Sequence, residues 1–176
     1  MKFSADRTRL VTLALVLTMM GAPTFLKGAQ RRKPPMSGQV TEGFQLSATA
    51  DVEEVTSGQP IRLRIVIKNV TKKPLYLAEV GVEKDYSLSI SNDKRIDVPL
   101  TEHGKAVLDG DVYMNLSLIV KPGEERRDVL EVNNLYDMTA PGEYSILVQR
   151  KVGRLNAKGT AQVQSNVVHV RVISRK

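Results

Sequence analysis

The side chains that most often carry acid–base and nucleophilic chemistry are scarce in this chain. It has two histidines, His103 and His169, and no cysteine. No Gly-x-Ser-x-Gly or His-Glu-x-x-His spacing is present, and these are the spacings that place a reactive group beside its activator or two ligands on one zinc ion. The sequence therefore predicts no catalytic residue and a protein that is not an enzyme.

The best candidate for metal binding is the segment Asp109-Gly110-Asp111. It offers two carboxylates, whereas calcium takes about six to eight oxygen ligands. The D-x-D-x-D-G spacing of calcium-binding loops is absent. We expect a turn at this position, no metal site and no cofactor.

The net charge of +7 is concentrated in the N-terminal part of the chain. Residues 37–176 hold 19 Lys and Arg against 18 Asp and Glu, so they are close to neutral. A nucleic-acid-binding domain usually carries a strongly basic face or stripe. We therefore expect no nucleic acid partner.

Charge is also divided between the two parts of residues 37–176. Residues 37–143 carry 12 basic and 18 acidic side chains, and residues 144–176 carry seven basic side chains and no acidic one. One interpretation is that the basic last strands lie beside acidic ones. The other is that Lys151, Arg154 and Lys158 form a basic finger at a hairpin tip, because loops on a rigid sandwich often carry binding.

The N-terminal part has the pattern of an export signal. Three basic residues within Met1–Arg9 precede the apolar run Leu10–Met20, which is shorter than the roughly 20 residues that span a bilayer. We interpret residues 1–29 as a signal peptide or an uncleaved anchor. Residues 30–42 are predicted to be a basic, proline-containing linker, and residues 43–176 one domain. The protein is expected to be periplasmic, secreted or associated with the cell envelope.

Residues 43–176 show the alternation of half-buried strands. In Ile61–Ile67 and Tyr86–Ile90, apolar side chains take one face and polar side chains the other. No run after Leu26 keeps a helical period for more than a turn or two, and Glu102–Asp111 reads as a polar loop. Further strands are predicted at 44–50, 75–80, 95–101, 114–120, 127–132, 143–152 and 159–173.

A compact corner joins two of these strands. Asn133–Thr139 is short and rich in Asn and Asp, so we expect one helical turn there. Pro141 and Gly142 then form a turn, and Tyr144 opens the next strand. This spacing is typical of the tyrosine corner of Greek-key sandwiches, whose hydroxyl group bonds to the backbone a few residues upstream.

Together these patterns predict an all-β fold. About eight or nine antiparallel strands, with turn signals about every 8–12 residues, are typical of an immunoglobulin-like Greek-key β-sandwich. In this chain the predicted signal segment precedes the sandwich. The Cys and Trp residues of true immunoglobulin cores are absent, so Ile, Leu, Val and Tyr must fill the core.

Four segments occur in an order that resembles a group of exported bacterial immunoglobulin-like domains. They are SGQPIRLRIVIKNVTKKPLYL (57–77), DYSLSI (85–90), KPGE (121–124) and LYDMTAPGEYSI (135–146). In that group an N-x-T-x-K-P turn follows a long strand and P-G-x-Y opens a later one. The order resembles, more faintly, proteinase inhibitors of the BsuPI type. The resemblance implies the fold over most of residues 44–173, and its second part implies proteinase inhibition.

We expect a non-enzymatic binding or accessory module that contacts another protein of the cell envelope through loops or a sheet edge. One alternative is a proteinase inhibitor that inserts a loop such as 102–112 or 151–159. Another is a carbohydrate-binding module that uses Tyr76, Tyr113 and Tyr136, which are out of phase with their apolar neighbours. Contact with a membrane is expected only through an uncleaved N-terminal segment.

Overall fold

The computed structural model describes residues 38–111 and 116–175. The chain divides into two units, Met1–Arg31 and Arg32–Lys176, and the described residues belong to the second. The predicted signal segment and most of the predicted linker lie outside the described residues, as do Tyr113 and Met114. Within the described residues, no helix is long and apolar enough to cross a membrane.

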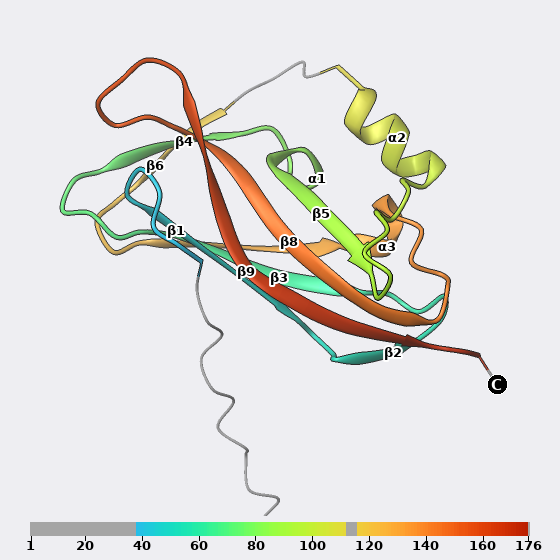
Figure 1. Ribbon diagram of the computed structural model, residues 1–176. Coiled ribbons are helices and arrows are strands. Elements are labelled where there is room, and N and C mark those ends of the chain that lie inside the picture. Colours follow the sequence, from blue (N-terminus) through green and yellow to red (C-terminus); the bar gives the residue numbers. More distant parts are fainter. Residues whose placement is uncertain (1–37, 112–115, 176) are drawn as a thin grey trace, which may run out of the picture. The chain divides into compact units, whose positions relative to one another are not determined.

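Nine strands and three short helices make up the described part of the chain (Figure 1). The strands are β1 (Phe44–Ala50), β2 (Glu54–Thr56), β3 (Arg62–Asn69), β4 (Leu75–Glu79), β5 (Tyr86–Asn92), β6 (Leu116–Val120), β7 (Glu125–Glu131), β8 (Gly142–Gly153) and β9 (Thr160–Ile173). The helices are α1 (Val82–Asp85), α2 (Glu102–Asp109) and α3 (Val132–Leu135).

Two main sheets pack against each other. One has the strand order β1-β3-β7 and the other β2-β9-β8-β5, while β4 and β6 form a separate two-stranded sheet. This division of the strands is that of an immunoglobulin-like sandwich, so the predicted fold class is confirmed. One part of the prediction was wrong: β2 pairs with β9 in parallel, not antiparallel. With three residues, β2 is too short to show a period.

The core follows from the alternation along the strands. In β3, Leu63, Ile65 and Ile67 are fully buried and Arg62 and Arg64 face solvent, as predicted. Burying such a side chain stabilises the fold by about 1.5–3 kcal/mol. All buried apolar side chains of the described residues lie between Phe44 and Val172. The sandwich therefore contains a complete core of its own.

A side chain closes the outer edge of β1. The register between β8 and β9 shifts after Leu147, which inserts a bulge in β9. Bulges redirect a side chain out of the strand pattern. Here the carboxamide of Asn166 accepts a hydrogen bond from the Ala48 backbone N–H at 3.0 Å and donates one to the Ala48 carbonyl oxygen at 2.9 Å. Asn166 thus bonds to β1 in the way a neighbouring strand would.

The corner between β7 and β8 has the predicted form. The helical turn α3 leads into Pro141 and Gly142, and the Tyr144 hydroxyl group donates a hydrogen bond to the Ala140 carbonyl oxygen at 2.6 Å. The Tyr144 ring is buried in the core. The bond therefore fastens the crossover to the start of β8.

We expect Tyr144→Phe to lower the free energy of unfolding by about 1–1.5 kcal/mol, because the ring remains and one hydrogen bond is lost. Urea denaturation of both proteins measures this difference. Tyr76→Phe is the control, since Tyr76 is 66% exposed and should give no change. Equal stability of the two variants would show that the corner bond contributes nothing.

The predicted strand Arg95–Thr101 is wrong. Its residues form only isolated bridges, Ser91 with Asp97 and Leu100 with Tyr136, and Ile96 is exposed rather than buried. The reason is that the segment bonds first to β5 and then to α3. Because it changes partner within a few residues, no continuous ladder can form.

The predicted loop Glu102–Asp111 is also wrong, because Glu102–Asp109 forms α2. The Thr101 hydroxyl group accepts a hydrogen bond from the Gly104 backbone N–H at 2.9 Å, which caps the helix N-terminus. Gly104 allows α2 to lie against α3, since a side chain there would collide with the Leu135 carbonyl oxygen. A helix at this position does not supply the extended inhibitory loop considered for residues 102–112.

Candidate functional site

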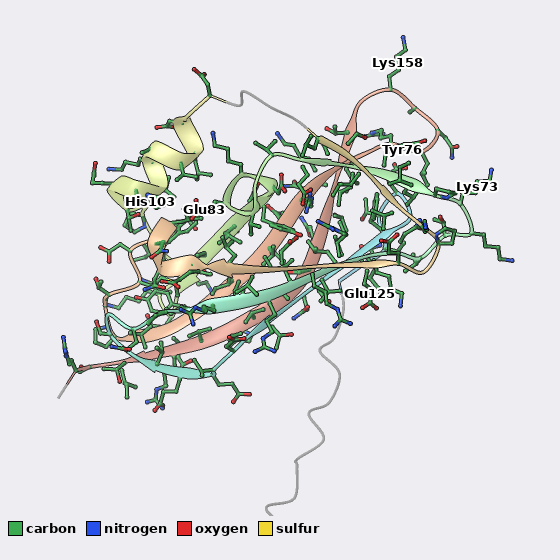
Figure 2. All side chains as sticks on the ribbon, turned by 180° about the vertical axis from the view of Figure 1, so that it is seen from behind. Lys73, Tyr76, Glu83, His103, Glu125 and Lys158 are labelled. Atoms are coloured by element: carbon green, nitrogen blue, oxygen red, sulfur yellow. The ribbon has the colours of Figure 1, made fainter. Side chains whose placement is uncertain are left out.

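The two histidines lie in separate, exposed settings. His103 on α2 approaches the Glu83 carboxylate at 3.7 Å (Figure 2). His169 on β9 lies 3.2 Å from the Ser145 hydroxyl oxygen on β8, and the two residues are cross-strand partners. In the described part of the chain, no carboxylate lies within 4.0 Å of His169 to orient its ring, as a catalytic triad requires. We assign no catalysis to either histidine.

No group of three or more His, Asp and Glu side chains that could hold a metal ion is found within residues 38–111 and 116–175. Asp109 ends α2, and Gly110 follows it. The Lys84 ammonium group donates hydrogen bonds to the carbonyl oxygens of Gly110 and Asp111, at 2.6 and 3.1 Å. The positive charge of Lys84 therefore lies at this turn, where it would repel a calcium ion.

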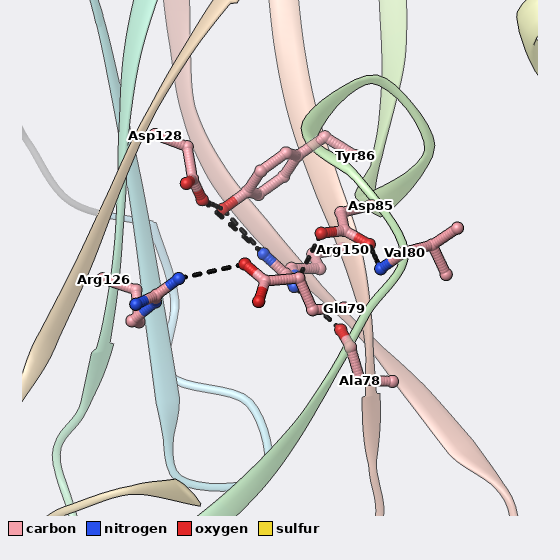
Figure 3. Close-up of polar contacts among 8 residues, drawn as sticks. All are labelled: Ala78, Glu79, Val80, Asp85, Tyr86, Arg126, Asp128 and Arg150. Atoms are coloured by element: carbon pink, nitrogen blue, oxygen red, sulfur yellow. Dashed lines mark hydrogen bonds and ion pairs between the residues drawn. The ribbon is translucent and has the colours of Figure 1, made fainter. Parts of the chain in front are cut away.

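A buried polar cluster surrounds Arg150 between the two main sheets (Figure 3). The Arg150 side chain is 2% exposed, and its guanidinium lies 3.2 Å from the Asp85 carboxylate and 3.8 Å from that of Asp128. It donates further hydrogen bonds to the Tyr86 hydroxyl oxygen and to the Ala78 carbonyl oxygen, both at 2.9 Å. The guanidinium carbon also lies 4.8 Å from the centre of the Tyr86 ring. Arg150 thereby joins β8 to β4, β5 and β7.

Tyr86 completes this cluster. Its hydroxyl group donates a hydrogen bond of 2.6 Å to the Asp128 carboxylate. Burial raises the pKa of Tyr86 well above its ordinary value, and Asp128 adds to this effect while Arg150 opposes it. The hydroxyl group therefore stays protonated and remains a donor. Since no buried side-chain N or O atom in the described residues lacks a partner, we interpret the cluster as structural.

The basic residues of the acid-free segment 144–176 fall into two groups in the structure. The first group, Arg150 and Arg171, pairs with acidic residues. Arg150 pairs with Asp85 and Asp128, and Arg171 lies 3.4 Å from Glu143 and 3.7 Å from Glu54. For these two arginines the basic last strands complement acidic neighbours. The alternation of buried residues Tyr144, Ile146 and Val148 continues to Arg150, so the sequence contained an unrecognised signal for a buried arginine.

Lys151, Arg154 and Lys158 differ from those two arginines. All three are exposed, and in the described part of the chain none has a carboxylate within 4.0 Å. Lys151 lies on β8, whereas Arg154 and Lys158 lie in the turn between β8 and β9. The structure therefore divides the predicted finger: Lys151 belongs to a strand and the other two to the hairpin tip.

The hairpin tip packs beside the turn between β3 and β4. The Leu155 backbone N–H donates to the Glu42 carboxylate at 2.9 Å, and the Val70 backbone N–H donates to the Gly43 carbonyl oxygen at 2.9 Å. Gly43 has a φ of +80°, and a side chain there would meet Thr71 and Leu155. We call this end of the domain the basic tip; its basic side chains are Lys72, Lys73, Arg154 and Lys158. Figure 2 shows Lys73 and Lys158 at this end, away from His103.

A second surface is formed by β4 and β6. Tyr76 on β4 and Ile119 on β6 are directly paired across the strands and point outward, with 66% and 56% of their surface exposed. The sheet has no third strand in the described part of the chain, so one edge of β6 is free. We call Tyr76, Ile119 and this edge the β6 surface.

The three tyrosines considered for carbohydrate binding do not come together. Tyr113 lies outside the described residues. The Tyr136 hydroxyl group donates a hydrogen bond to the Leu88 carbonyl oxygen at 3.0 Å, which holds this residue at the α3 corner. Tyr76 lies at the other end of the domain, close to the basic tip (Figure 2). Tyr76 and Tyr136 therefore do not form one sugar-stacking platform.

The described cavities are shallow. One, of about 400 Å³, lies between α1 and α2 and is lined by Val80, Val82, Val107 and their neighbours. The other, of about 210 Å³, lies on the outer face of the β8–β9 sheet beside Leu147 and Val167. Neither cavity contains the Arg150 cluster, the basic tip or the β6 surface.

The fold and these sites define an immunoglobulin-like β-sandwich domain in which the candidate sites are exposed surfaces. No protein-family model matches the sequence, and no curated protein matches it. Among solved structures, the C-terminal domain of wzt is similar at 12% identity over 81% of each chain, with a TM-score of 0.49.

Two further solved structures are similar at comparable identity. The CARDB domain of a Pyrococcus furiosus protein has 15% identity and a TM-score of 0.38, and the match covers 78% of this chain and 100% of that domain. A β-glucosidase from Listeria innocua has 14% identity and a TM-score of 0.41, and the match covers 75% of this chain but 16% of the enzyme. We assign the fold from the strand order itself.

Proposed function

We propose that this chain is a non-enzymatic binding or accessory module of the cell envelope and that its partner is a protein. The pattern of residues 1–29 supports export, as argued from the sequence. The candidate acid–base groups are scattered over exposed positions, which supports binding rather than catalysis. The partner contacts the β6 surface.

The observation that carries this proposal is the composition of the free edge. β6 reads Leu-Ser-Leu-Ile-Val and contains no charged residue. Exposed strand edges attract other chains, and proteins usually protect them with charges, prolines or covering segments. An uncharged free edge beside an exposed Tyr76 is therefore suited to a partner that adds a strand.

The edge strand β7 provides the contrast within the same domain. It reads Glu-Arg-Arg-Asp-Val-Leu-Glu, so five of its seven residues are charged. These charges discourage strand addition. β7 is therefore protected by charge. The edge strand β5 also lacks charged residues, but the segment that follows it forms backbone hydrogen bonds with Ile90 and Asn92. β6 has no charged residue and, in the described part of the chain, no third strand beside it.

Ile119→Lys should weaken partner binding by about tenfold or more, because it places a charge on the edge where the partner strand would pair. The measurement is affinity capture from an envelope extract with the folded domain, followed by titration of the purified partner against both proteins. The matched control is Val129→Lys on β7, since Val129 is 58% exposed and Ile119 56%.

Equal loss in both lysine variants, or loss in neither, would contradict the β6 surface as the binding site. If the captured protein is a protease, inhibition of its activity by the wild-type domain decides whether the module is an inhibitor. Repeating the capture at high salt distinguishes binding at the β6 surface from binding at the basic tip, because pairing at an uncharged edge is insensitive to salt.

A further inference from the structure

The basic tip carries exposed apolar side chains among its charges. Val40, Val70 and Leu155 are 48%, 42% and 48% exposed. They come from three separate segments that meet at Gly43: Val70 through its backbone bond to Gly43, and Leu155 through its packing against it. Val40 lies three residues before Gly43 in the chain. The fold thus brings the segments that carry Val70 and Leu155, 85 residues apart in the sequence, together at Gly43.

The charges around these side chains are mostly positive. Lys72 and Lys73 come from the β3–β4 turn, and Arg154 and Lys158 from the β8–β9 hairpin. Acidic residues also lie near them: the Glu42 carboxylate accepts the Leu155 backbone N–H, and the Glu124 carbonyl oxygen accepts the Asn69 backbone N–H at the start of the β3–β4 turn. The turn itself is firmly held, because the buried Asn69 side chain donates a hydrogen bond to the Lys73 carbonyl oxygen at 2.8 Å.

The chain also enters the domain beside β1 and β9, the strands next to this tip. The Gly38 backbone N–H donates to the Leu46 carbonyl oxygen at 2.9 Å, and Gly38 lies against Gln164. The sequence places Arg31, Arg32 and Lys33 five to seven residues before Gly38, and the apolar run Leu10–Met20 ends 18 residues before it.

We propose that the basic tip docks on the surface of an anionic lipid bilayer, with Val40, Val70 and Leu155 entering the headgroup region and the four basic side chains contacting lipid phosphates. Shallow insertion of apolar side chains combined with basic residues is the usual composition of such surfaces. This contact uses other side chains than the β6 surface, although Tyr76 of that surface lies close to the tip (Figure 2).

Two arguments favour a bilayer over another anionic occupant. A flexible polyanion would neutralise the lysines but would offer no apolar surface to the three aliphatic side chains. A standard protein interface buries about 800 Å² on each partner, whereas the tip is formed by a few turn residues. A bilayer needs only these few side chains, since each basic residue adds about fivefold to the affinity for an anionic surface.

The chain contains no tryptophan, so one introduced residue is a unique fluorescent reporter. The test uses the full chain with vesicles of phosphatidylglycerol and phosphatidylcholine whose acyl chains are brominated and quench tryptophan. The reporter is Leu155→Trp, with Val40→Trp as a second position. The control is Ile96→Trp, since Ile96 is 58% exposed and lies at the opposite end of the domain, near the end of β5.

We expect a blue shift and quenching at positions 155 and 40, and neither effect at position 96. Adding Arg154→Glu and Lys158→Glu should lower the docked fraction roughly tenfold or more, because two attractive charges become repulsive. Ile119→Lys should leave the quenching unchanged. Equal quenching at positions 155 and 96, or equal quenching with purely zwitterionic vesicles, overturns the proposal. A blue shift at position 155 with poly-L-glutamate but not with vesicles overturns it in favour of an acidic protein.

Discussion

Arg150→Met is expected to lower the free energy of unfolding by about 3–5 kcal/mol. Methionine fills much of the volume but leaves the Asp85 and Asp128 carboxylates without their counter-charge, and their side chains are only 5% and 12% exposed. Removing one partner of a buried ion pair lowers the free energy of unfolding by this amount because an uncompensated charge stays in a medium of low dielectric constant. Urea denaturation and thermal unfolding measure the loss.

The control for this variant is Arg171→Met on β9. Arg171 also contacts two carboxylates, but its side chain is 60% exposed. An exposed pair contributes about 1 kcal/mol or less, since water and salt screen it. Adding Asp85→Asn and Asp128→Asn to Arg150→Met should restore part of the lost stability. Similar losses for the two arginine variants would show that the buried cluster does not stabilise the fold.

Asn69→Ala is expected to lower the free energy of unfolding by about 3 kcal/mol. The Asn69 side chain is fully buried and donates hydrogen bonds to the Lys73 and Val120 carbonyl oxygens, at 2.8 and 2.9 Å. Its oxygen accepts the Thr71 backbone N–H and hydroxyl group, at 2.9 and 2.8 Å. Removing it abolishes these hydrogen bonds, of which the one to the Val120 carbonyl oxygen is buried, and each hydrogen bond contributes about 0.5–1.5 kcal/mol.

Asn134→Ala is the matched control, because the same group is removed from an exposed position on α3. Chemical denaturation of both variants separates the stability lost with the buried hydrogen bonds from the stability lost by replacing any asparagine with alanine. If Asn69→Ala were no less stable than Asn134→Ala, the turn between β3 and β4 would not depend on Asn69. The burial of Asn69 also excludes its side chain as an acceptor of N-linked glycan in the folded domain.

The alternation of side chains made much of the fold predictable. It placed Leu63, Ile65 and Tyr86 inside, and the turn residues placed the corner at Tyr144. The N-x-T-x-K-P segment was recognised as turn chemistry, and the hydrogen bonds of Asn69 now explain why Asn and Thr occupy it. These features were predictable because each depends on residues close together in the sequence.

The pairing of β6 was not predictable in this way. The four residues Lys121–Glu124 join β6 to β7, a distance typical of a hairpin, yet β6 pairs with β4 and β7 with β3. The reason is that this connecting turn bonds to the end of β3, where the Asn69 backbone N–H donates to the Glu124 carbonyl oxygen at 3.1 Å. The two strands therefore diverge into different sheets, and local propensity contains no sign of this.

The candidate surfaces, too, could be predicted only in part from the sequence. The charge division drew attention to Arg154 and Lys158, since both lie in an acid-free part of the sequence. Lys72 and Lys73 joined them only in the folded domain, because they are about 80 residues away in the chain. Tyr76 was recognised as out of phase with the core, but its neighbour Ile119 depends on the pairing of β4 with β6.

The side chain of Asn166 has a consequence for the protein at high concentration. A strand edge that meets no strand of its own chain can exchange with that of another copy, which leads to swapped dimers and insoluble fibres. Asn166 occupies the β1 edge with two hydrogen bonds from one amide group. The uncharged edge strand β5 is covered at its end by the segment around Ile96 and Val98. Within the described residues, β6 is therefore the uncharged edge on which two copies can meet most easily, so crowding should make self-association compete with the partner for the same strand.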